Sequence, residues 1–210
     1  LSSAPGPMQL LPTPEYGNGW LKVRDGGNVV SLPQQGDPYG EIYTVRGKWW
    51  SMCEDRLINP LNKEADPKKR QAQVDADWIA FAGTIRKDVE VFHGKVKGKY
   101  HAATHAFIGQ SDKHKAYGTV SWDRDTHLDH ARARANMPVP KMQEIMAADD
   151  TPWRGPGATT PDLLGKNRNP AFEAGGKPYT EKFRISDPDE PGDGTVPHRS
   201  GIAPKVHCKS

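Results

Sequence analysis

The chain has 210 residues, of which 35% are hydrophobic, and it contains 21 glycines and 19 prolines. The mean hydropathy of -0.79 is low, and this composition favours a loop-rich domain with a modest core. The formal net charge is only +3, and the basic residues are scattered, which argues against nucleic acid as the main partner. No apolar run approaches the length of a membrane span.

The first residue is Leu1 rather than a methionine, and the opening lacks the charged start and long apolar core of a signal peptide. We therefore expect a fragment of a longer product. The two cysteines, Cys53 and Cys208, lie near opposite ends of the chain. They could pair in an oxidising compartment or remain free thiols.

Prolines and glycines interrupt the first forty residues, which predicts irregular structure with brief strands at 20–24 and 28–32. One or two short helices are expected within 37–57. Their aromatic and aliphatic residues are best interpreted as core, namely Tyr39, Ile42, Tyr43, Trp49 and Trp50.

The clearest predicted helix lies within 63–96. Asp66 and Pro67 are suited to the N-cap and first helical positions, and Gly94 or Gly98 is expected to end the helix. The apolar residues recur near helical spacing and predict a buried face, which consists of Val74, Trp78, Ile79, Phe81, Ile85, Val89 and Phe92.

Strands are predicted at 103–109 and 117–122, joined by a polar turn, and again at "EKFRIS" (181–186). Between them, 123–182 is rich in Pro, Gly, Asp, Arg and Asn, with one weak helical stretch at 140–148. A loop this long is commonly functional or mobile. We therefore divide the chain into a sheet-and-helix portion of the core (1–122), a loop-rich insertion or lid (123–182) and a last-strand region (183–210).

Asp193 is the candidate site residue. It stands between two glycines in "GDGTVP" (192–197), after a predicted strand. Flanking glycines allow a sharp turn that aims the carboxylate, although the same residues are typical of an ordinary Asp-Gly turn.

Three other clusters carry weaker alternatives. Asp123, Asp125, His127, Asp129 and His130 could bind a metal or form a solvated loop. Oxygen ligands for Ca²⁺ could come from the acidic run that holds Asp187, Asp189, Glu190 and Asp193, which lacks the EF-hand pattern. A third cluster, interpreted as a basic strand edge or turn, contains His93, His101 and His105 with Lys95, Lys97 and Lys99.

The order of strand, polar turn, strand, long excursion, short strand and "GDGTVP" resembles the C-terminal half of lecithin–cholesterol acyltransferase-like α/β hydrolases. The opening "APGPMQLLPTPEYGNGWL", with "SLPQQGDPYGEIY" and "THAFIGQSDKHKAYGTVSW", resembles bacterial lipase effectors of type VI secretion systems. The resemblance implies an α/β fold class, as the C-terminal portion of an α/β-hydrolase fold with a long loop-rich insertion. It also implies that Asp193 is the acid of a Ser-His-Asp triad.

The remaining triad members are not found by motif. No G-x-S-x-G occurs in the chain, so the nucleophilic serine and the oxyanion hole are expected outside residues 1–210. In these hydrolases the histidine follows the acid. Only His198 and His207 follow Asp193 here, and both are close to it, so we expect the base beyond Ser210, with His198 as the alternative.

The resemblance further implies part of a serine ester hydrolase, a lipase or phospholipase, acting as an antibacterial effector delivered to the periplasm of a target cell. Its partners would be a lipid or ester substrate, a transiently contacted membrane surface, and an immunity protein or secretion-apparatus component. No cofactor is expected, with Ca²⁺ left open. The competing interpretation is a non-catalytic binding module that docks a secretion, chaperone or immunity protein through exposed Trp49, Trp50 and Trp153.

Overall fold

The computed structural model describes residues 4–101, 103–127, 129–134, 138–149 and 166–204. Its largest sheet has five strands in the order β2-β1-β4-β8-β5. Only the β1–β4 pair is parallel, and the other three pairs are antiparallel. The strands of this mixed sheet are β1 (Leu21–Asp25), β2 (Asn28–Leu32), β4 (Val120–Arg124), β5 (Asn167–Arg168) and β8 (Phe183–Ile185).

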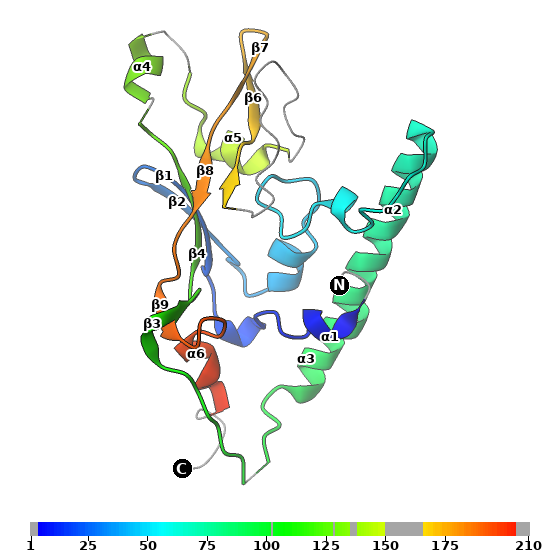
Figure 1. The fold of residues 1–210 in the computed structure, drawn as a ribbon, viewed down its shortest axis with the longest axis vertical. Coiled ribbons are helices and arrows are strands. Elements are labelled where there is room, and N and C mark those ends of the chain that lie inside the picture. Colours follow the sequence, from blue (N-terminus) through cyan, green and yellow to red (C-terminus); the bar gives the residue numbers. More distant parts are fainter. Residues whose placement is uncertain (1–3, 102, 128, 135–137, 150–165, 205–210) are drawn as a thin grey trace.

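Two antiparallel ribbons lie outside this sheet (Figure 1). One pairs β3 (Ser111–Ala116) with β9 (Glu190–Gly192), and the other pairs β6 (Ala171–Ala174) with β7 (Lys177–Thr180). Short helices fill the connections. They are α1 (Pro5–Met8), η1 (Pro14–Tyr16), η2 (Tyr39–Tyr43), η3 (Asp55–Leu57), α4 (Asp129–Arg134), α5 (Met142–Ala147) and α6 (His198–Gly201).

One long helix is formed by α2 (Pro67–Gly83), the π-helical turn η4 (Thr84–Val89) and α3 (Glu90–Val96). It lies apart from the sheet, with α1 and η2 between them (Figure 1). The predicted N-cap is confirmed, because the Asp66 carboxylate accepts hydrogen bonds from the backbone N–H groups of Lys68 and Lys69. The α3 segment ends at Val96, and Gly98 follows with a φ of +65° that favours glycine. No helix in the described residues is long and apolar enough to cross a membrane.

The buried face of this helix is narrower than the sequence predicts. Trp78, Phe81, Ile85 and Val89 are buried as expected. The predictions for Ile79 and Phe92 are wrong, because Ile79 points to solvent and Phe92 is 38% exposed. The buried stripe advances in i+4 steps from Ile85 through Val89 to His93, so the position after Phe92 faces the core.

The strands predicted at 20–24 and 28–32 are confirmed as β1 and β2, and "EKFRIS" contains β8. The strand predicted at 103–109 is wrong, since that segment is irregular and the polar turn after it forms β3 instead. Most side chains of β3 are exposed on both faces of the β3–β9 ribbon. The strand therefore lacks the alternation of apolar and polar residues by which a half-buried strand is recognised in a sequence. The strand predicted at 117–122 is β4, shifted to Val120–Arg124.

The segment 123–182 holds more regular structure than a loop-rich insertion suggests. It contains α4, α5, β5 and the β6–β7 ribbon, and β4 continues through 122 to Arg124. The division at 122 therefore falls inside a strand, and β5 pairs within the main sheet. The residues 150–165, in the middle of this segment, lie outside the described structure.

Trp49 and Trp50 are core residues that also secure α5. The indole N–H of Trp49 donates to the carbonyl of Ile145 at 2.7 Å, and that of Trp50 donates to Met146 at 3.0 Å. These carbonyls belong to the last turn of α5, where few backbone N–H donors remain to pair with them. Both tryptophans are buried, at 2% and 8% exposure, so the prediction that they act as exposed anchors is wrong. Trp153 lies outside the described residues.

A buried ionic cluster secures one end of β4. The Arg124 side chain is 2% exposed and donates to Asp25 and Asp129, each at 2.6 Å, and to Glu181 at 3.2 Å. Glu181, itself 1% exposed, also pairs with Arg132 of α4. The cluster thereby joins β1, β4, α4 and the approach to β8.

Candidate functional site

Asp193 lies in the loop 192–197 between β9 and α6, which we call the acid loop. Its Oδ1 accepts hydrogen bonds from the backbone N–H groups of Thr195 at 2.9 Å and Val196 at 2.7 Å. Gly194 has a φ of +93°, a left-handed conformation that favours glycine. The segment therefore adopts an Asp-Gly turn in which the aspartate side chain fixes its own loop.

The Asp193 carboxylate remains accessible to further donors. Both hydrogen bonds from the turn end on Oδ1, so neither occupies Oδ2. The N–H groups of Val196 and Thr195 lower the pKa of Asp193, because they stabilise the charged form. The residue is exposed and presents a fixed anionic oxygen at the surface of the acid loop.

Close packing against residue 109 holds the acid loop in place. A Cβ added to Gly109 would lie 2.6 Å from the Cβ of Asp193, which is closer than real contacts allow. A Cβ on Gly192 would lie 2.4 Å from the carbonyl oxygen of Val196. Both glycines are therefore required for the observed path of the backbone.

The acidic residues near the loop are bound by protein donors. Asp189 Oδ1 accepts from the N–H groups of Gly118 at 2.8 Å and Thr119 at 3.0 Å. Glu190 accepts from the backbone and side chain of Arg199, both at 2.6 Å. These contacts attach β9 and α6 to the start of β4.

The second acidic cluster is likewise divided among different partners. Asp123 accepts from the Ser121 hydroxyl, Asp125 pairs with His127, and Asp129 pairs with Arg124. Within the described ranges, no group of three His, Cys, Asp or Glu residues is arranged to hold a metal ion.

The candidate histidines are not joined to Asp193 in the part of the chain that the structure describes. His198 is the first residue of α6, and its Nδ1 is buried without a hydrogen-bond partner among these residues. His207 and Cys208 lie outside them. His93, interpreted as part of a basic strand edge, is instead a buried residue of α3.

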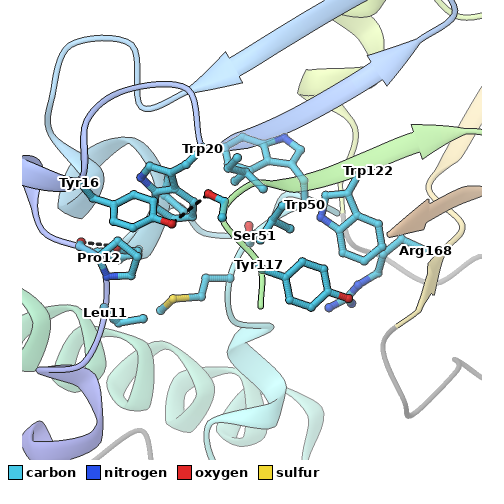
Figure 2. A pocket seen from close by; sticks show the side chains of 15 residues that line it. Leu11, Pro12, Tyr16, Trp20, Trp50, Ser51, Tyr117, Trp122 and Arg168 are labelled. Atoms are coloured by element: carbon cyan, nitrogen blue, oxygen red, sulfur yellow. Dashed lines mark hydrogen bonds between the residues drawn. The ribbon is translucent and has the colours of Figure 1, made fainter. Parts of the chain in front are cut away.

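A pocket of about 330 Å³ lies beside β4 (Figure 2). Residues 11–21, 50–52 and 117–122 form most of its wall, together with Arg168 of β5. Its lining is rich in aromatic rings, and we call it the aromatic pocket. The rings belong to Tyr16, Trp20, Tyr43, Trp50, Tyr117 and Trp122.

Contacts connect the aromatic pocket to the segments on either side of the acid loop. The Tyr16 hydroxyl donates to the carbonyl of Gly118 at 3.0 Å, while the N–H of Gly118 donates to Asp189. The guanidinium of Arg199, in α6, lies 5.1 Å from the centre of the Tyr16 ring. Burial raises the pKa of Tyr16, so its hydroxyl stays protonated and continues to donate. The sequence did not predict that Tyr16 lines a pocket, because an isolated tyrosine belongs to no recognisable motif.

No family model and no curated protein matches the sequence. One chain of a solved structure, "The crystal structure of Tle4-Tli4 complex", is similar in fold, with a TM-score of 0.60 and 21% sequence identity. The match covers 98% of the present chain and 37% of the other, so this chain spans little more than a third of its neighbour's length. At this identity the similarity concerns the fold alone, a mixed sheet combined with helices.

Proposed function

We propose that this chain is the C-terminal part of a serine ester hydrolase of the lipase or phospholipase type and supplies Asp193 as the triad acid. The observation that carries the proposal is the fixed, charged Asp193 carboxylate on an exposed loop. The contacts of Tyr16, Gly118 and Arg199 connect the segments that flank this loop to an apolar pocket.

The role follows from the chemistry of acyl transfer. The acid accepts the Nδ1 proton of a histidine in a hydrogen bond, which fixes the imidazole tautomer. It also stabilises the imidazolium that forms when the histidine takes the proton of the serine hydroxyl. Because the backbone of the turn binds only Oδ1 of Asp193, Oδ2 can accept the hydrogen bond from Nδ1 of the histidine. Its lowered pKa keeps it charged at neutral pH.

The serine, the oxyanion donors and the histidine would come from segments beyond residues 1–210, with His198 as the alternative base. For His198 to act, its Nδ1 would have to move toward Asp193, since no hydrogen bond joins them in the described structure.

The exposed residues around the acid loop support transient contact with a lipid surface. Phe107 is 95% exposed, and Val196 in the acid loop itself is 43% exposed. The contact of Gly109 with Asp193 keeps the Phe107 segment close to the loop. Exposed apolar side chains such as these, beside the acid loop, favour insertion among lipid chains.

The similarity to a chain of the Tle4–Tli4 complex fits this proposal and adds a partner protein to it. We propose that the whole protein is an antibacterial effector delivered to the target-cell periplasm, with an immunity protein or secretion component as its partner. A purely non-catalytic docking module is the alternative. It would have to use surfaces other than the buried Trp49 and Trp50.

The test uses the whole protein, a panel of acyl esters and phospholipids, and a fluorophosphonate that labels activated serines. We expect ester hydrolysis that the fluorophosphonate abolishes, and labelling of a serine beyond residues 1–210. Absence of both hydrolysis and labelling in folded protein would refute the proposal that the protein is a serine ester hydrolase and would favour the docking module.

A further inference from the structure

The walls of the aromatic pocket present carbon rather than polar atoms. The Tyr43 hydroxyl donates to the carbonyl of Pro12 at 2.5 Å, and that of Tyr16 donates to Gly118. The indole N–H of Trp50 is bound to Met146. The polar groups of these three lining rings are therefore already engaged in hydrogen bonds within the protein.

Arg168 belongs to a partly buried cluster in which two arginines, with side chains 29% and 39% exposed, surround one carboxylate. Glu54, which is 9% exposed, accepts from Arg56 at 2.6 and 2.9 Å and from Arg168. Burial raises the pKa of Glu54, but the combined effect of Arg56 and Arg168 is larger and opposite. The pKa of Glu54 is therefore below the ordinary value. Two guanidinium groups thus share one carboxylate among the described residues.

Arg168 also has an unused donor. Its Nε is buried and lacks a hydrogen-bond partner in the described part of the chain, as does the Nε1 of Trp20. The Arg168 guanidinium lies 6.0 Å from the ring centre of Trp122. Figure 2 shows Arg168 and Tyr117 toward one side of the pocket, with Leu11 and Pro12 toward the other. Buried donors without acceptors are costly and call for an explanation.

We propose that the aromatic pocket binds an anionic amphiphile, a single unbranched apolar chain that ends in a carboxylate. The chain would lie between the aromatic rings, and the carboxylate would bind Arg168 and offset the excess positive charge. The volume of about 330 Å³ accommodates roughly ten groups of about 30 Å³ each, the share of one water molecule in the liquid. A chain of about ten carbons therefore fits. This binding is independent of catalysis by Asp193.

The test titrates the whole protein with sodium decanoate below its micelle-forming concentration, followed by calorimetry and tryptophan fluorescence. Decanoate should bind with one site per chain and perturb the fluorescence, because Trp20, Trp50 and Trp122 line the pocket. Octanoate, with two fewer methylenes, should bind roughly tenfold more weakly. Decanol and decyltrimethylammonium lack the negative charge and should also bind at least roughly tenfold more weakly.

Two variants and one control variant locate the binding. Leu11→Trp fills the pocket from its apolar side and should abolish decanoate binding, whereas Leu10→Trp, at a neighbour that is 87% exposed, should not. Arg168→Gln should weaken decanoate but not decanol. Equal affinity for decanoate and decanol, no decanoate binding at all, or unchanged binding by a folded Leu11→Trp protein would overturn the proposal. The Leu11 pair keeps the test decisive if Arg168→Gln fails to fold, because it leaves the charged cluster intact.

Discussion

The Tyr39 hydroxyl donates a hydrogen bond to Nδ1 of His93 across 2.7 Å, while Nε2 of the same ring donates to the carbonyl of Gln9 at 2.9 Å. The carbonyl can only accept, so the proton of the neutral imidazole lies on Nε2 and Nδ1 accepts from the tyrosine. Burial, with smaller effects of Glu90 and Asp37, raises the pKa of Tyr39 to about 12, so the hydroxyl keeps its proton. The pair joins the N-terminal segment to α3 through η2.

Removal of the Tyr39 hydroxyl alone should be costly. Tyr39→Phe leaves Nδ1 of His93 buried without a donor, and we expect a loss of about 1–3 kcal/mol in the free energy of unfolding. Tyr39→Phe combined with His93→Leu removes both partners and should cost less than the sum of the two single changes. Urea unfolding of the four proteins measures this coupling. Strict additivity would show that the hydrogen bond is not energetically important.

Substitution of the buried Arg124 should lower the free energy of unfolding more than substitution of an exposed arginine beside it in the sheet. Arg124→Gln leaves Asp25, Asp129 and Glu181 without their shared cation and should cost about 3–5 kcal/mol. The matched control is Arg24→Gln, whose pair with Asp123 spans 3.7 Å between half-exposed side chains and should contribute less than about 1 kcal/mol. Similar losses in urea unfolding for both variants would contradict the role of the cluster.

Two glycine-to-alanine changes should have opposite effects. Gly109→Ala forces the backbone of the acid loop to move, because the new Cβ would clash with Asp193. We expect lower stability and, in the whole protein, lower esterase activity. Gly94→Ala lies in α3 with no atom within 4 Å of the new Cβ, so it should stabilise by about 0.5–1 kcal/mol. Thermal unfolding and ester hydrolysis of both variants test this contrast, and a neutral Gly109→Ala would refute the packing argument.

Asp189 should make stability dependent on acid pH. Burial raises its pKa, but the N–H groups of Thr119 and Gly118 lower it more, and the net result is a pKa below the ordinary value of an aspartate. A group with a depressed folded pKa stabilises the fold above its unfolded pKa and loses this contribution as the pH falls through the folded pKa. The stability difference between wild type and Asp189→Asn should therefore be largest near neutral pH and shrink below about pH 4.

Urea unfolding at a series of pH values checks that expectation. Asp187→Asn, an exchange at an exposed neighbour, is the control for removing one carboxylate from this segment. A difference for Asp189→Asn that stays constant from neutral pH to pH 3 would contradict the account.

Local signals predicted part of the fold. Asp66 and Pro67 marked the start of α2 because capping and proline placement depend on neighbouring residues alone. The exposure of Ile79 and Phe92 could not be predicted, since it depends on which face the long helix turns toward α1, η2 and η3. The ribbon of β3 and β9 was missed for a related reason. Its strands are far apart in sequence, and the mostly exposed side chains of β3 do not alternate.

For the candidate site, the sequence predicted the loop but not its surroundings. The glycines around Asp193 indicated the turn, which the structure confirms, whereas the role of Asp193 in catalysis stays a prediction. The aromatic pocket could not be predicted, because its walls come from segments as far apart in the sequence as Leu11 and Arg168. Trp49 and Trp50 illustrate the same limit, since their exposure depends on packing against α5.

The central claim is that Asp193 orients a catalytic histidine, and the most direct test is kcat for Asp193→Asn in the whole protein. The amide retains an Oδ1 that accepts from Thr195 and Val196, and Asp193 is exposed, so the turn should be kept and the melting temperature should change little. Loss of the charge favours the wrong imidazole tautomer, and kcat should fall by up to roughly 10⁴-fold. Asp187→Asn should retain normal kcat. Near-normal hydrolysis by Asp193→Asn at an unchanged melting temperature would contradict the claim and remove Asp193 from the mechanism.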